Sequence, residues 1–66
     1  MNYIVTQEAA LTYEVGYACD NAIFLSLGKE RFFLTDGRYA ISAQEEVSGA
    51  TIVIANDIVL KAATLI

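Results

Sequence analysis

The segment from Phe32 to Ala55 constrains the fold of this 66-residue chain more than any other part. The apolar run Phe32–Thr35 predicts a strand, residues 40–47 predict a helix, and Thr51–Ala55 predicts a second strand. Two strands joined by a helix usually lie parallel, with a right-handed crossover. We therefore expect at least part of the sheet to be parallel.

The first half of the chain predicts antiparallel strands. Tyr3–Thr6 has the composition of a short strand, and Leu11–Tyr17 alternates with a period of two, which also favours a strand. Ala22–Leu27 is a stronger strand, with Ile23, Leu25 and Leu27 on one face and Phe24 on the other. Gly28–Arg31 supplies turn residues, so Ala22–Leu27 and the strand after the turn form a predicted hairpin.

Two helices complete the predicted fold. The first follows Asp36, whose carboxylate can accept hydrogen bonds from the free N–H groups at a helix start, and it ends at Ser48–Gly49. The second is capped by Asp57. We therefore expect an α/β fold, with a small mixed sheet of about five strands flanked by two helices. The apolar stripe of the second helix comprises Ile58, Val59, Ala62, Ala63 and Ile66.

The chain is unusually apolar for its length. Hydrophobic residues make up 56% of it and the mean hydropathy is +0.47, whereas a small globule buries only about 60% of its surface. We therefore expect exposed apolar surface that drives association into a homo-oligomer, most simply a dimer. The last residues, Leu65–Ile66, interrupt an apolar stripe, so we expect residues 1–66 to form a single, partial domain of a longer protein.

Charge and cysteine content exclude several functional classes. Four basic and eight acidic residues give a net charge of −4, and without a basic stripe we expect neither nucleic acid nor an anionic membrane as a partner. No apolar run approaches the ~20 residues that span a bilayer, and no signal peptide is visible, so we expect a cytoplasmic location. Cys19 is the single cysteine, so no internal disulfide can form.

Four stretches of the chain follow the order of a known pattern. They are Tyr3–Thr6, the aromatic-leucine-threonine-glycine-aromatic segment around Leu11–Tyr17, Asn21–Leu25, and Thr35-Asp36-Gly37-Arg38-Tyr39 followed by Ala43, Glu45, Glu46 and Val47. In this order they resemble the N-terminal domain of the creatinase, prolidase and aminopeptidase P family of metallopeptidases. The family's N-terminal domains are about twice as long as this chain.

The resemblance implies a non-catalytic role for the chain. In such enzymes a separate catalytic domain binds two divalent metal ions and cleaves the bond before proline. This chain has no histidine, and we expect no catalytic residue, metal ligand or cofactor in it. The parent enzyme would be an Xaa-Pro aminopeptidase or a dipeptidase, with a creatinase-type enzyme left open, and its catalytic domain would be a partner. The alternative is a stand-alone α/β interaction module that self-associates.

The resemblance also implies which residues could meet a substrate. Arg38, and with it Tyr39, would lie near the substrate entrance, where a guanidinium can bind a carboxylate in a bidentate manner. The simpler alternative, to which we give more weight, is that Arg38 pairs with Asp36 or Glu45 and fixes the corner between the strand that ends at Thr35 and the helix after Asp36. Asp36 and Asp57 are interpreted as helix caps. Cys19 is interpreted as an inert thiol and Glu45–Glu46 as a solvated helix face.

Overall fold

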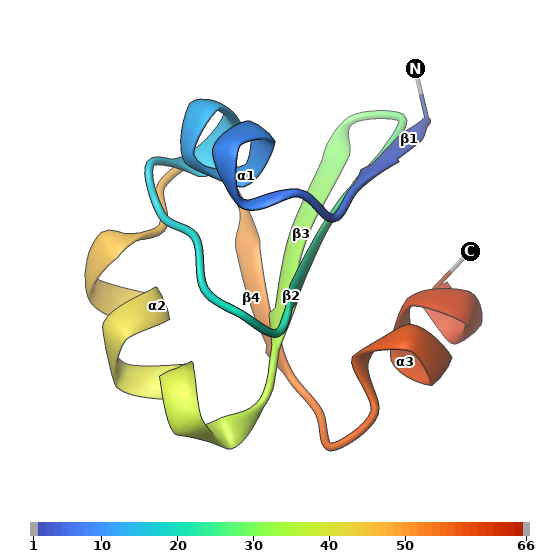
Figure 1. Cartoon of the computed structure of the whole chain (residues 1–66). Coiled ribbons are helices and arrows are strands. Elements are labelled where there is room, and N and C mark those ends of the chain that lie inside the picture. Colours follow the sequence, from blue (N-terminus) through green and yellow to red (C-terminus); the bar gives the residue numbers. More distant parts are fainter. Residues whose placement is uncertain (1, 66) are drawn as a thin grey trace.

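The computed structural model describes residues 2–65, which form a four-stranded sheet in the order β1-β2-β3-β4 with helices on both faces (Figure 1). The expected α/β fold with a mixed sheet is confirmed, with four strands in the described part of the chain. In chain order the elements are β1 (Tyr3–Val5), α1 (Glu8–Val15), β2 (Ala22–Leu27), β3 (Glu30–Thr35), the short 3₁₀ helix η1 (Gly37–Tyr39), α2 (Ala40–Glu46), β4 (Thr51–Ile54) and α3 (Ile58–Leu65).

The sheet is built around the hairpin of β2 and β3. The two strands pair antiparallel from Ala22 opposite Thr35 to Leu27 opposite Glu30. The loop between them has two residues, and Gly28 at its first position has a φ of 62°, which glycine adopts more easily than other residues. β1 adds antiparallel to β2, and β4 adds parallel to β3, as the strand-helix-strand segment predicts.

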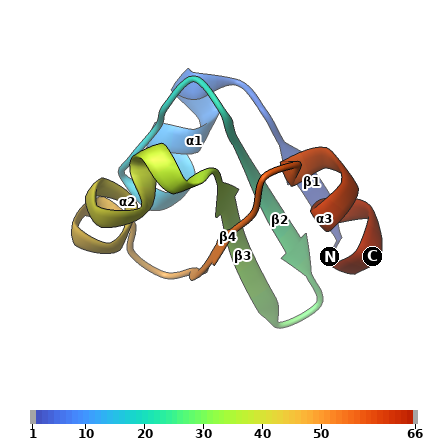
Figure 2. The same cartoon turned by 90° about the horizontal axis from the view of Figure 1, so that it is seen from below.

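Each face of the sheet has its own apolar cluster. Figure 2 shows α1 and α2 on one face and α3 on the other. Because successive side chains of a strand point to opposite faces, β2 sends Phe24 to the first face and Ile23 and Leu25 to the second. The first cluster contains Leu11, Val15, Cys19, Ala22, Phe24, Phe33 and Ala43, and the second contains Ile23, Leu25, Leu34, Ile58 and Ala62.

The prediction of a strand at Leu11–Tyr17 is wrong, because Glu8–Val15 forms helix α1. Leu11 and Val15 are four residues apart and point together into the sheet, with 0% and 1% of their surface exposed, whereas Tyr13 is 89% exposed. The apparent alternation therefore hides a helical pair, and α1 brings the number of α-helices to three in the described residues. Gly16 ends the helix in the left-handed region.

The apolar stripe of α3 is narrower than expected. Ile58 and Ala62 are buried against the sheet, but Val59 is 69% exposed and Ala63 is also exposed. The reason is that α3 packs on the sheet along one line of contact, so only residues four apart on one side of the helix are covered. Ile66, the last expected member of the stripe, lies outside the described residues.

Substitutions in α1 test the helical assignment. Leu11→Ala is expected to lower the free energy of unfolding by about 2–5 kcal/mol because it leaves a cavity beneath α1. Tyr13→Ala should change it by less than about 0.5 kcal/mol, because that ring is exposed. Urea titration of both variants followed by circular dichroism measures the difference. Similar losses for the two variants would contradict the helix, since a strand would place both side chains on one face.

Candidate functional site

The polar corner between β3 and α2 is the candidate site. Asp36 has an extended backbone (φ −91°, ψ 174°) and lies at the N-cap position of η1. Its Oδ1 accepts a hydrogen bond of 2.9 Å from the backbone N–H of Arg38, and its carbonyl oxygen accepts one of 3.2 Å from the N–H of Tyr39. The carboxylate thus fixes the turn that carries Arg38 and Tyr39 away from the sheet.

Arg38 is an exposed cation held in a fixed orientation. Its Nη2 donates to Oδ2 of Asp36 at 2.9 Å, and its Nε lies 3.2 Å from both carboxylate oxygens. The guanidinium carbon lies 5.1 Å from the centre of the Tyr39 ring. Although it has these two partners, 68% of the Arg38 side chain is exposed. The corner therefore exposes to solvent a guanidinium that its two partners already hold in place.

Asn21 belongs to the same corner and is absent from the site predicted from the sequence. Its Nδ2 donates to Oδ2 of Asp36 at 2.7 Å, while its carbonyl oxygen accepts a 2.7 Å hydrogen bond from the buried hydroxyl of Thr35. The hairpin register contained the signal, because pairing Ala22 with Thr35 puts Asn21 across from Asp36. In the sequence, Asn21 has a place only as the first residue of the stretch Asn21–Leu25 that follows the family pattern.

Electrostatics keep this pair ionised. The hydrogen bonds from Arg38 and then from Asn21 lower the pKa of Asp36 from its usual 3.8 to about 2. The hydrogen bond to Asp36 in turn raises the pKa of Arg38. At neutral pH the carboxyl group therefore has no proton to donate, and Asp36 serves as counter-ion and cap rather than as a general acid.

The corner lies at the carboxyl ends of two parallel strands, from which two helices leave. β3 and β4 are parallel, so their carboxyl ends lie side by side at one end of the sheet. There the N–H of Ala55 donates to the carbonyl oxygen of Thr35. From this end α2 leaves toward one face of the sheet and α3 toward the other (Figure 1). Open α/β sheets commonly bind ligands outside the carboxyl ends of their parallel strands. Asp57 lies at the same end of the sheet, and its Oδ1 accepts a hydrogen bond from the N–H of Leu60 at the start of α3.

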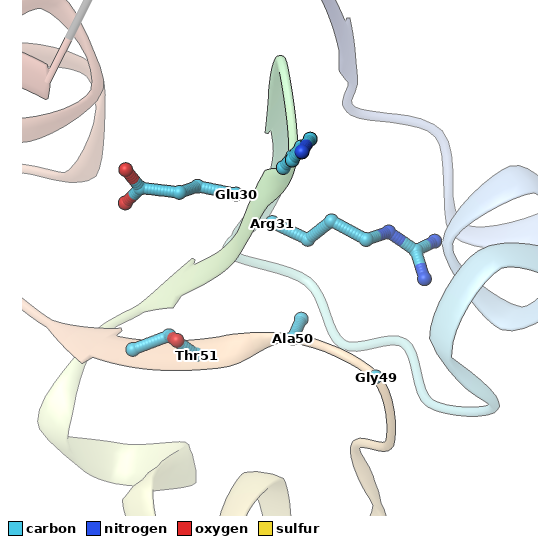
Figure 3. Close-up of a pocket in the computed structure, with 6 residues that line it drawn as sticks. Glu30, Arg31, Gly49, Ala50 and Thr51 are labelled. Atoms are coloured by element: carbon cyan, nitrogen blue, oxygen red, sulfur yellow. The ribbon is translucent and has the colours of Figure 1, made fainter.

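A hollow lies at the opposite end of β3. Its volume is about 330 Å³, and Figure 3 shows Glu30 and Arg31 extending to opposite sides of the strand that forms it. Arg31 is directed to Glu14, with 3.6 Å between Nη2 and Oε2, and its guanidinium carbon lies 4.9 Å from the centre of the Phe24 ring. Lys29 and Arg31 line the hollow together with the acidic Glu30, so we regard the hollow as a surface feature of mixed charge. It is lined by Lys29, Glu30, Arg31, Gly49, Ala50 and Thr51.

The remaining chemically capable side chains form no further site in residues 2–65. Cys19 is 8% exposed, and its Sγ lies 3.4 Å from the hydroxyl oxygen of Thr35. Glu45 and Glu46 are exposed on α2. No group of three or more acidic or cysteine side chains in the described part of the chain could hold a metal ion. None of the helices described there has the length and apolar character needed to cross a bilayer.

The structure is similar to part of two solved Xaa-Pro aminopeptidases. The crystal structure of aminopeptidase P, an Xaa-Pro aminopeptidase from Streptococcus thermophilus, matches with a TM-score of 0.85 and 27% sequence identity. That of an Xaa-Pro aminopeptidase from Streptococcus pyogenes matches with the same TM-score and 29% identity. Each match covers 94% of this chain and 48% of the solved chain. No protein-family model and no curated protein matches the sequence.

These two structures confirm the resemblance to the aminopeptidase P group that the Thr35–Tyr39 segment indicates. They also confirm the fold class, since the match includes nearly all of the chain. The chain spans about half the length of the solved chains that it matches. The similarity therefore extends to a fragment of an Xaa-Pro aminopeptidase chain.

The Asp36 carboxylate makes folding stability depend on pH. Its folded pKa of about 2 is below the usual 3.8, so its stabilising effect is complete above about pH 5 and is lost as the pH falls toward 2. Asp36→Asn keeps a capping side chain but removes the charge. The melting temperature of the wild type should exceed that of the variant at pH 6, and the gap should close by pH 2.

Glu45→Gln is the matched control for this experiment, because it removes one negative charge from an exposed position on α2. Its melting temperature should follow that of the wild type across the same pH range. A gap between wild type and Asp36→Asn that stays constant from pH 6 to pH 2 would show that the charge of Asp36 has no part in holding the corner.

Proposed function

We propose that this chain is a non-catalytic part of an Xaa-Pro aminopeptidase, in which it contributes to the substrate entrance and to self-association. The observation that carries the proposal is the structural match over 94% of the chain to two Xaa-Pro aminopeptidases. Within the matched fold, the corner at Thr35–Tyr39 holds a charged side chain in position while leaving 68% of it exposed. The role is therefore one of binding and positioning.

The chemistry of the corner supports binding rather than bond cleavage. Peptide hydrolysis needs an activated water and a group that accepts its proton. The corner offers Arg38, which stays protonated, and Asp36, which is engaged by that guanidinium and by Asn21. In the proposed parent enzyme, two divalent metal ions held by a separate catalytic domain would activate the water.

Arg38 is the residue that we propose meets the substrate. Asp36 occupies the Nε and Nη2 side of the guanidinium, and the side chain is still largely exposed. The opposite edge can therefore bind a carboxylate, such as the C-terminus of a peptide or an acidic side chain. Because Asp36 and the Tyr39 ring already restrict the guanidinium, little side-chain entropy would be lost on binding. Tyr39 would act by supporting Arg38.

Exposed apolar side chains support the proposed self-association. Large apolar residues are exposed on α1, α2 and α3, among them Tyr13, Ile41, Val59 and Leu60, with exposures between 63% and 89%. Their removal from water would favour a contact with another copy or with the rest of a parent chain. The same observation supports the second candidate function, a stand-alone interaction module, which differs in having no catalytic domain in the same protein.

The coding sequence and an activity assay distinguish these two functions. If the chain is part of an Xaa-Pro aminopeptidase, its reading frame should continue into a domain that contains histidine and clustered carboxylates. The 66-residue chain alone should not hydrolyse Xaa-Pro peptides in the presence of Mn²⁺ or Co²⁺, whereas the full-length protein should. A reading frame that stops at Ile66, or turnover by the short chain above background, would contradict the proposal.

Arg38→Ala in the full-length protein tests the role of the corner. Loss of a charge-assisted hydrogen bond costs ~1.5–3 kcal/mol, so KM for a peptide with a free carboxylate should rise at least about tenfold with little change in kcat. Amidation of that carboxylate should produce a similar rise in the wild type and no further rise in the variant. Lys29→Ala, at the other end of β3, is the control. Equal KM values for Arg38→Ala and wild type would remove Arg38 from the entrance.

A further inference from the structure

The corner between β3 and α2 exposes its cation and covers its anion. The side chain of Arg38 is 68% exposed, whereas that of Asp36, 2.9 Å away, is only 15% exposed. Oδ1 of Asp36 accepts from the backbone N–H and the Nε of Arg38. Oδ2 accepts from Nε and Nη2 of Arg38 and from Nδ2 of Asn21. Because a carboxylate has about four lone-pair sites, these donors from the chain itself fill its capacity to accept.

Asn21 and the backbone of Arg38 together fix the rotation of the Asp36 carboxylate. Nδ2 of Asn21 donates to Oδ2 at 2.7 Å, and the backbone N–H of Arg38 donates to Oδ1 at 2.9 Å. Rotation of the carboxylate about its Cβ–Cγ bond would break both hydrogen bonds. Since a guanidinium that pairs with two oxygens lies close to the carboxylate plane, this orientation also decides where the free edge of Arg38 points.

Thr35 ties Asn21 to the interior of the protein. Its side chain is 0% exposed, and its hydroxyl donates to the carbonyl oxygen of Asn21 at 2.7 Å. Because the hydroxyl proton is used in this bond, the thiol of Cys19 is the donor in the 3.4 Å contact between Sγ and Oγ1 of Thr35. All contacts from the buried hydroxyl to the exposed guanidinium lie within residues 19–38, so they do not depend on what covers the edges of the sheet.

We propose that Asn21 is a positioning residue for Arg38, which holds the Asp36 carboxylate in one orientation so that the far edge of the guanidinium faces a substrate carboxylate. This role rests on the proposed place of Arg38 at the substrate entrance and adds the residue that prepares it. Asp36 and Arg38 are two residues apart and could pair in several orientations. Asn21 comes from the other strand of the hairpin, across from Asp36, and selects one of them.

Asp20 shows why the orientation of Arg38 matters. The hydrogen bond to Asp36 raises the pKa of Arg38 most, and the negative charge of the exposed Asp20 adds to it. A guanidinium released from Asp36 could therefore turn to Asp20, and the edge that would bind a substrate would then be neutralised within the chain. By keeping Nε and Nη2 of Arg38 on Asp36, Asn21 leaves the other N–H groups of the guanidinium for the substrate.

Asn21→Ala in the 66-residue chain tests the positioning directly. Removal of the donor should raise the pKa of Asp36 from about 2 toward its usual 3.8, because the hydrogen bond from Asn21 is the second cause of the lowered pKa after those from Arg38. The order parameter of the Arg38 Nε–H bond should fall as the carboxylate loses its fixed orientation. NMR titration of the Asp36 carboxyl carbon and ¹⁵N relaxation of Arg38 measure the two effects.

Asn56→Ala is the matched control, because it removes the same side chain from an exposed position between β4 and α3. It should leave the pKa of Asp36 and the order parameter of Arg38 at their wild-type values. Circular dichroism checks that both variants fold. If Asn21→Ala does not fold, Asn21→Leu replaces it, because leucine has nearly the size and shape of asparagine and has no donor.

Kinetics of the full-length protein test the effect on the substrate. Asn21→Ala should raise KM for a peptide with a free carboxylate about threefold to tenfold, with little change in kcat, since binding must then restrict a mobile guanidinium. KM for the amidated peptide should stay at the wild-type value. When Arg38→Ala is already present, Asn21→Ala should cause no further rise, because the two residues act through one contact.

The outcomes separate the role of Asn21 from that of Arg38. If Arg38→Ala raises KM and Asn21→Ala does not, Arg38 keeps its place at the entrance and the positioning role of Asn21 is overturned. Equal rises for the free and the amidated peptide in Asn21→Ala would also overturn it, because they would reflect a general effect on the fold. Wild-type NMR values in Asn21→Ala would do the same. If Arg38→Ala itself leaves KM unchanged, the entrance role of Arg38 fails and the role of Asn21 fails with it.

Discussion

The hairpin of β2 and β3 is the constraint on which the rest of the structure depends. Its two strands lie in the middle of the sheet, and Phe24, Phe33, Leu25 and Leu34 have at most 1% of their surface exposed. Because these side chains alternate between the two faces, they supply both apolar clusters, and α1, α2 and α3 pack on a surface that the hairpin defines. β1 and β4 add to its two edges. A shift of one residue in its register would exchange the two faces.

The same register builds the candidate site. With Ala22 opposite Thr35, the residues just beyond the paired ends are Asn21 and Asp36, and their side chains form a 2.7 Å hydrogen bond. Asp36 is held on one side by Asn21 and on the other by the guanidinium of Arg38. The packing of the hairpin thus fixes the position of an exposed cation at the end of the sheet from which α2 and α3 diverge. An unsupported surface arginine would lose more entropy on meeting an anion.

The apolar character of the chain has a structural consequence at its surface. Both clusters are small, and the sheet has open edges, so apolar side chains such as Ile54 and Leu60 remain in contact with water. A longer relative can cover such surface with its own residues, and a short chain can cover it by association. The match to about half of each solved Xaa-Pro aminopeptidase chain agrees with a fold that buries its centre well and its periphery poorly.

The sequence by itself determined the mixed sheet, the parallel pair after the crossover and the hairpin turn at Gly28, because each follows from local spacing. The motif Thr35–Tyr39 carried the family resemblance. Only the tertiary structure decided that Leu11 and Val15 form one side of a helix, since a period of two and a spacing of four cannot be told apart in seven residues without the surface that buries them. It also decided that Asn21 completes the corner, because that contact joins residues brought together by strand pairing.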